Sequence, residues 1–174
     1  YVEIEVASGE RYILAEALVG SVISEEYEVI RKCVGNDLYG MEYEPLFDFA
    51  TLDKKAYFVV ADGYVTLTDG TGVVHIAPAF GEDDSRVGKD NNLPFVQLVD
   101  EQGNFSKETG EWAGTFVKDA DKLVLNDLEE RGLLFAALPY EHSYPFCWRC
   151  DTPLLYYAID TWFIKMSALR DRLV

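Results

Sequence analysis

The sequence predicts an α+β domain that is mainly β and barrel-like. Short apolar stretches rich in β-branched and aromatic residues recur along the chain, and clusters of turn residues separate them. Only a few segments show the apolar spacing of a helix. With 174 residues, of which 49% are hydrophobic, the chain is long enough to bury its own core. Short strands with a few helices between them are typical of such a domain.

The first third of the chain is predicted to be β structure with short interruptions. Its strands are expected over residues 1–6, 10–14 and 27–34. Ser8-Gly9 supplies the turn between the first two strands, and residues 15–23 form a short helix. The third strand ends at Gly35-Asn36-Asp37. The aromatic, proline-containing segment 38–49 that follows is expected to be a packed irregular loop.

The middle of the chain is predicted to alternate strands and turns until a helix begins near Gly81. Strands are expected over residues 57–61, 64–67, 73–77 and 95–99. Turns are expected over residues 68–72 and 100–104. Pro78 ends the strand before it. The carboxylates after Gly81 favour the start of a helix, because they meet the positive end of the helix dipole.

The last third begins with the clearest predicted helix, over residues 118–131, which Gly132 ends. Strands are then expected over residues 133–138, 140–144 and 154–159. The sequence contains no internal repeat and no low-complexity stretch.

The net charge of the chain limits the class of partner. It is formally −16, from 31 acidic and 15 basic residues. Because Lys and Arg provide most of the affinity for nucleic-acid backbones, this charge argues against a free-standing nucleic-acid binder. It does not argue against a domain that receives one nucleotide end while another part of the protein supplies the basic surface.

Apolar runs and cysteines indicate the compartment. No apolar run reaches the length of a membrane span. A signal peptide is not expected, because residues 1–6 already alternate as a strand. Cys147 and Cys150 form a CxxC pair while Cys33 stands alone, which fits a reducing environment. We therefore expect an interior piece of a cytoplasmic protein that has no contact with a membrane.

The most informative segment runs from Gly70 to Asp84 and reads GTGVVHIAPAFGEDD. A strand, a proline turn and an acidic helix start are expected to bring His75 and Asp84 to one cleft. Glycines let the backbone approach a ligand closely, and apolar side chains wall a pocket and limit its size. The further residues expected to bind a substrate are Gly70, Thr71, Gly72, Pro78, Phe80 and Asp83.

Each of these features also has an ordinary structural explanation. Carboxylates in a first turn, here Glu82 to Asp84, can simply cap a helix. A lone histidine in an apolar strand, such as His75, is usually a core residue. A Gly-Thr-Gly sequence is by itself only a turn.

The order of these residues resembles the editing-site signature of the aminoacyl-tRNA synthetases for isoleucine, valine and leucine. His75 and the Gly-Glu-Asp-Asp ending are most similar to the isoleucine type. A second stretch, HSYPFCWRCDTPL over residues 142–154, is similar to the segment where the chain of that type leaves its editing domain, and Trp162-Phe163-Ile164 continues the match. The resemblance covers the whole chain.

The resemblance implies a hydrolase that removes valine from mischarged tRNA(Ile), inside an ATP-dependent isoleucine–tRNA ligase. Asp84 and His75 are then the expected catalytic pair. An ionised Asp84 binds the substrate ammonium by a charge-assisted hydrogen bond. His75 contacts the amino acid or the terminal ribose and orders the attacking water. The implied partners are the acceptor end of tRNA(Ile) and the remaining domains of the same synthetase.

The resemblance also predicts how the chain is divided into domains. It further shows where the sequence departs from the pattern of the family. Residues 1–159 are expected to form the editing domain, and residues 160–174 the start of the connection back to the synthetic domain. The threonine-rich Thr-Thr-Thr-Pro-Trp-Thr segment of the editing pocket is missing and would precede Tyr1, so the chain alone is expected to hydrolyse weakly. The ATP-binding signatures of the synthetic domain are also missing from the sequence.

The pair Cys147 and Cys150 has the spacing of half a zinc ribbon, whereas a structural zinc site needs four ligands. No metal or other cofactor is therefore expected on this chain alone. The resemblance implies that some relatives complete such a site with cysteines from outside this segment, which allows zinc in the longer enzyme. Simple reduced cysteines are the alternative.

Three other functions compete with valine editing. The first is the editing domain of the valine or leucine enzyme. The second is a non-catalytic module that only positions the tRNA acceptor end. The third is an unrelated acidic β-domain with a structural CxxC pair.

Overall fold

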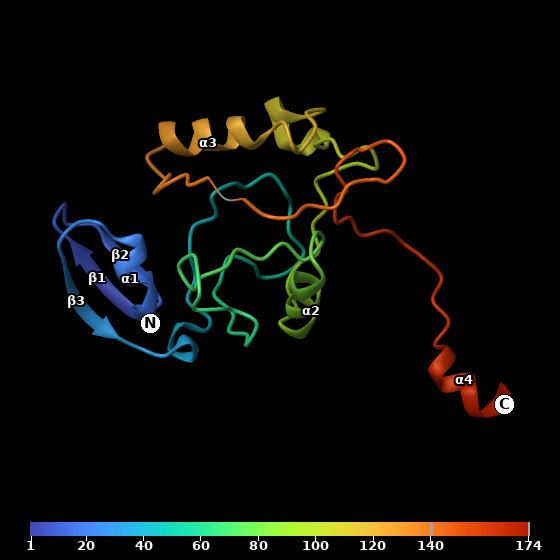
Figure 1. Cartoon of the computed structure of the whole chain (residues 1–174), viewed down its shortest axis with the longest axis horizontal. Helices are drawn as coiled ribbons and strands as arrows, with labels where there is room; N and C mark the ends of the chain where they lie inside the picture. The colour runs from blue at the N-terminus through green and yellow to red at the C-terminus, as the bar shows by residue number, and fades with distance from the viewer. Residues whose placement is uncertain (140, 174) are drawn as a thin grey trace.

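The computed structural model describes residues 1–139 and 141–173, and Figure 1 shows how its elements are arranged. The strands are β1 (Val2–Val6), β2 (Arg11–Leu14) and β3 (Tyr27–Lys32). The helices are α1 (Val19–Val22), α2 (Glu82–Asp90), α3 (Asp121–Glu130) and α4 (Met166–Leu173). Short 3-10 helices cover Glu16–Leu18, Gly35–Leu38 and Lys107–Trp112. The α+β class is thus confirmed.

The N-terminal sheet is antiparallel, with strand order β2-β1-β3. Gly9 forms the predicted tight turn between β1 and β2, where its φ is +88° and its N–H donates to the Val6 carbonyl at 2.8 Å. Alternate residues of β1 face one side of the sheet, and α1 follows β2 on that side. The buried core of this unit consists of Val2, Ile4, Val6, Leu14, Val19 and Ile23.

The barrel-like part of the prediction is not confirmed, because the three-stranded sheet stays open. Several segments that were predicted to be strands form no strand in the described residues: 57–61, 64–67, 73–77, 95–99, 133–138, 141–144 and 154–159. Residue 140, where one predicted strand begins, lies outside the described residues. A strand requires a ladder of hydrogen bonds to a neighbouring backbone. Among the residues that the structure describes, those outside the sheet pair only at single bridges, such as Glu42 with Phe58.

The predicted helices are confirmed, with shifted ends. Residues 15–23 form the first 3-10 helix and α1. Gly81 is the N-cap of α2, and α3 ends before Gly132, whose φ of +68° suits a glycine after a helix. The helix α4, within residues 160–174, was not predicted.

Aromatic rings from segment 38–49 and from the third 3-10 helix form a second packing centre. Phe47 stacks on Phe49 with ring centroids 5.5 Å apart, and Trp112 meets both rings edge-on at 5.1 and 5.4 Å. The guanidinium of Arg131, just after α3, lies 5.0 Å from the centre of the Phe47 ring. The predicted packing of this irregular segment is therefore confirmed at its end, whereas Tyr39, Met41, Tyr43 and Leu46 are exposed.

The C-terminal helix α4 lies at the end of an extended segment, away from the other elements (Figure 1). The side chains before it are apolar and exposed: Trp162 is 100% and Phe163 84% accessible. Within the described residues, no helix combines the length and apolar character needed to cross a membrane.

Candidate functional site around the start of helix α2

The predicted site is built on the turn that leads into α2. Residues 73–77 form neither a helix nor a strand, and a turn over residues 78–80 follows, in which the Phe80 N–H donates to the Ala77 carbonyl at 2.9 Å. Ala79 and Val87 are buried beneath the helix. A Cβ on Gly88 would lie 2.9 Å from the Pro78 ring, so the helix packs directly on this turn. Pro78 thus packs against the last turn of α2, and Phe80 directly precedes the N-cap Gly81.

Asp84 lies in the first turn of α2 with its carboxylate folded back towards the N-cap. Its Oδ2 accepts a long hydrogen bond of 3.4 Å from the Ala77 N–H. A Cβ on Gly81 would lie 2.7 Å from that oxygen, so this conformation of Asp84 requires glycine at residue 81. Asp84 is half-buried, whereas Glu82 and Asp83 are exposed. The carboxylate therefore belongs to the helix entrance and is also accessible to a ligand.

A bidentate ion pair joins the loop before residue 64 to α2. Arg86 donates to the two oxygens of Asp62 at 2.8 and 2.9 Å. This hydrogen bonding from Arg86, with a further hydrogen bond from the Tyr64 N–H, lowers the pKa of Asp62 to about 2. Sequence analysis missed the pair because its members lie far apart in the chain and no spacing rule connects them.

Tyr64 is connected to α2 through the same ion pair, because its N–H donates to Asp62 Oδ1 at 3.1 Å. Its hydroxyl oxygen is buried and has no hydrogen-bond partner among the described residues. Burial, followed by the negative charges of Asp84 and Asp62, raises the pKa of Tyr64. The hydroxyl therefore remains protonated, and so a donor, throughout the neutral range.

The surroundings of His75 and of the Gly70-Thr71-Gly72 turn differ from the cleft that the sequence predicts. The His75 side chain is exposed, and in the described part of the chain its ring has no hydrogen-bond or ion-pair partner. Gly72 is buried against the N-terminal unit: a Cβ there would lie 2.6 Å from the Ala15 Cβ. Its carbonyl accepts from the Tyr1 hydroxyl at 2.7 Å, and the Thr71 carbonyl accepts from the Ala15 N–H at 2.8 Å. The turn thus has a packing role.

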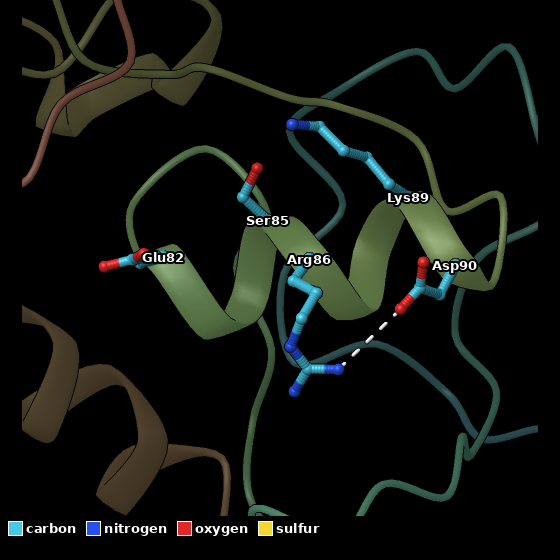
Figure 2. A pocket seen from close by; sticks show the side chains of 5 residues that line it. All are labelled: Glu82, Ser85, Arg86, Lys89 and Asp90. Carbon is cyan, nitrogen blue, oxygen red and sulfur yellow. Dashed lines mark ion pairs between the residues drawn. The ribbon is translucent and has the colours of Figure 1, made fainter. Parts of the chain in front are cut away.

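Two shallow hollows are described on the surface, and neither is lined by His75 or Asp84. The first, of about 360 Å³, lies on the outer face of α2 (Figure 2), where Glu82, Ser85, Arg86, Lys89 and Asp90 line it. The second, of about 340 Å³, lies beside the aromatic rings of Phe47, Phe49 and Trp112.

The CxxC pair forms a tight turn near the C-terminal end. The Cys147 N–H donates to the Thr152 carbonyl at 2.9 Å, and the Asp151 N–H donates to the Cys147 carbonyl at 2.9 Å. Hydrogen bonding to Thr152 lowers the pKa of the Cys150 thiol. No cluster of three or more metal-binding side chains occurs among the described residues. Two thiols supply half of the four ligands of a structural zinc site.

Comparison with known proteins relates the whole chain to one kind of enzyme. It is 53% identical over 174 residues to an isoleucine–tRNA ligase of Clostridium acetobutylicum. It is 45% identical over 168 residues to that of Picrophilus torridus, and 43% over 180 residues to that of Bdellovibrio bacteriovorus. These alignments cover 97–100% of this chain but only 16–17% of each relative's length. No protein-family profile matches the chain. The chain therefore corresponds along its whole length to one segment of the isoleucine–tRNA ligases.

Proposed function

We propose that this chain, which matches isoleucine–tRNA ligases along its full length, is the editing domain of such an enzyme and hydrolyses valyl-tRNA(Ile). The longer protein would charge tRNA(Ile) with isoleucine in the cytoplasm, using ATP. The observation that carries the proposal is the half-buried Asp84 carboxylate at the entrance of α2. It lies within the motif that resembles the editing signature, in a chain 53% identical to one of these ligases.

The proposed mechanism begins with capture of the substrate amine. An aminoacyl ester carries an ammonium beside its reactive carbonyl, and Asp84 binds that ammonium by a charge-assisted hydrogen bond. The amide of Ala77 contacts Oδ2 at 3.4 Å, so both carboxylate oxygens keep lone pairs for a ligand. Binding at this point holds the ester at the helix start.

Hydrolysis then requires an ordered water and donors near the developing oxyanion. The exposed side chain of His75 precedes the turn that leads into α2 and is accessible to a substrate. We assign to it contact with the amino acid or the terminal ribose, and ordering of the water. No cofactor takes part in these steps.

Selection between amino acids rests on size. A synthetic site built for isoleucine cannot strongly exclude valine, because the two differ by one methylene group. A smaller second pocket admits valine, excludes isoleucine by steric conflict, and hydrolyses what enters. Pro78 and Phe80, in the turn that leads into α2, are the side chains that we assign to this wall.

The experiment that tests the proposal is Asp84→Ala in the full-length ligase. Deacylation of valyl-tRNA(Ile) is expected to fall at least tenfold while charging with isoleucine continues, because only the amine anchor is removed. Asp90→Ala is the matched control, since Asp90 lies on the same helix, is 66% exposed and contacts Arg86 at 3.7 Å. An unchanged deacylation rate in Asp84→Ala would refute the proposal.

The exposed position of His75 favours one competing function, a module that positions the tRNA acceptor end without catalysis. In that case Asp84→Ala would weaken tRNA binding and leave deacylation unchanged. The similarity to isoleucine–tRNA ligases argues against an editing domain of the valine enzyme. Cleavage of threonyl-tRNA(Val) with sparing of valyl-tRNA(Ile) would reverse that assignment.

A further inference from the structure

The hollow of about 340 Å³ has a wall of aromatic rings. Phe47, Phe49 and Trp112 line it, and each of these side chains is half-buried, so part of every ring is open to a ligand. Their ring centroids lie 5.1 to 5.5 Å apart, so the three rings support one another. Such a wall binds apolar groups and also cations, because the face of an aromatic ring carries negative potential.

The charged side chains of the same hollow favour a cation. Asp48, Glu111 and Asp127 line it, together with one basic side chain, Arg131. Asp48 and Glu111 are exposed, and within the described part of the chain neither forms a hydrogen bond or an ion pair with its side chain. Two negative charges are therefore uncompensated beside the rings, and they repel an anionic ligand.

One cation of the chain itself already lies against this wall. The Arg131 guanidinium is 5.0 Å from the centre of the Phe47 ring, and its Nε lies 2.8 Å from Oδ2 of Asp127. An aromatic ring and a carboxylate thus hold this guanidinium together. The other rings and the two unpaired carboxylates of the hollow offer the same two kinds of group to a second cation.

We propose that this hollow binds an alkylammonium or guanidinium group, the kind of cation that ends a lysine or arginine side chain. The rings of Phe49 and Trp112 contact the cation, and Asp48 and Glu111 compensate its charge. A neutral group of the same shape gains only the apolar contact. Neither His75 nor Asp84 lines the hollow, so this inference goes beyond the proposed function and does not depend on it.

The test titrates the 174-residue chain with n-butylammonium chloride and with n-butanol, its neutral counterpart of equal length, at constant ionic strength. The indole N–H signal of Trp112 in nuclear magnetic resonance spectra, assigned from its loss in Trp112→Phe, reports on the hollow. Butylammonium is expected to shift this signal along a saturable curve, and butanol to bind about fivefold more weakly. Trp148 and Trp162 lie outside the hollow and are 87% and 100% exposed, so their signals should not saturate with it.

The double variant Asp48→Asn with Glu111→Gln removes the two unpaired charges and keeps the shape of the hollow. It is expected to bind butylammonium about fivefold more weakly and butanol unchanged. Glu25→Gln with Glu26→Gln is the matched control, because it removes two exposed carboxylates just before β3, outside the hollow. That control should bind both ligands normally, and thermal melting of both double variants should match the natural chain because the substituted side chains are exposed.

Two results would refute the proposal. One is equal affinity of the natural chain for butylammonium and butanol, or a Trp112 signal that does not saturate. The other is an equal loss of affinity in the Glu25 and Glu26 control, because the effect would then come from the overall charge of the chain.

A blocked tripeptide with a central arginine distinguishes the source of the cation. Tighter binding of the peptide than of butylammonium would support a side chain of a partner protein, and equal or weaker binding would support a free amine. Phe49→Leu tests the aromatic contact, since it keeps an apolar side chain without the ring. It is expected to weaken butylammonium about threefold and leave butanol unchanged, whereas an unchanged affinity for butylammonium would refute that contact.

Discussion

Gly70 and Gly72 occupy the same turn with φ of +67° and +74°, but their surroundings differ. A Cβ on Gly70 meets nothing within 4 Å, whereas one on Gly72 would overlap the Ala15 Cβ. Gly70→Ala is expected to lower the free energy of unfolding by about 1 kcal/mol, from the backbone alone. Gly72→Ala should lower it by a further 1–3 kcal/mol, roughly, from the overlap.

Denaturant unfolding of the two alanine variants would measure that difference. Equal losses would show that the turn can move away from Ala15 at little cost. The same variants distinguish a packing role from a ligand role, because the N-terminal unit depends on Gly72 whether or not a substrate is bound.

The position of a site residue could be predicted where it depends on neighbouring residues in the sequence. Gly81 followed by three carboxylates predicted the start of α2 and placed Asp84 in its first turn. Tyr64, Asp62 and Arg86 could not be found in this way, because their relation arises only when a loop meets a helix. His75 was expected to share a cleft with Asp84. It is exposed, because the segment that carries it has no strand partner to turn its side chain inward.

At the scale of elements, the Asp62–Arg86 pair links a loop to α2, and its contribution depends on pH. The pKa of Asp62 is lowered from an ordinary value of 3.8 to about 2, with the Arg86 hydrogen bonds as the main cause. A lowered carboxyl pKa contributes stability that is fully present above the unfolded value and is lost as pH falls through the folded value. The contribution should therefore disappear between about pH 4 and pH 2.

Thermal melts of the natural chain and of Asp62→Asn, compared from pH 7 to pH 2, test this. The difference in melting temperature is expected to be constant above about pH 5 and to shrink towards zero at the acid end. A difference that does not change with pH would mean that the asparagine acts through packing and that the ion pair contributes nothing.

The elements that the sequence predicted well are those whose partners lie nearby in the chain. The strands β1 and β2 meet across the Gly9 turn, and α3 is ended by Gly132. Segment 73–77 was predicted to be a strand because it is apolar, but it has no neighbouring strand among the described residues and forms neither a strand nor a helix. Periodicity identifies a side that can be buried; it does not identify the backbone that will pair.

At the scale of the whole molecule, the chain consists of a packed body and an extended C-terminal segment. Because α4 lies away from the other elements (Figure 1), deleting residues 160–174 is expected to leave the melting temperature of the rest unchanged. Circular dichroism of the shortened chain would measure this. A fall of several degrees would show that the segment packs on the body.

A substitution at the other end provides the contrasting control. The Tyr1 side chain connects the first strand to the glycine turn, because its hydroxyl donates to the Gly72 carbonyl at 2.7 Å. Tyr1→Ala should therefore lower the melting temperature where the C-terminal deletion does not. The predicted boundary between the editing domain and the connecting segment, near residue 159, stays a prediction until the melting temperatures of both variants are measured.

The hydrogen bond from the Ala15 N–H to the Thr71 carbonyl has a consequence for observing the molecule in solution. Deuterium enters that amide only when the bond opens. The exchange rate at Ala15, in the N-terminal unit, therefore records how often the glycine turn separates from the sheet. A single isotopically labelled alanine would report the motion of the turn that precedes His75, without any probe in the proposed site itself.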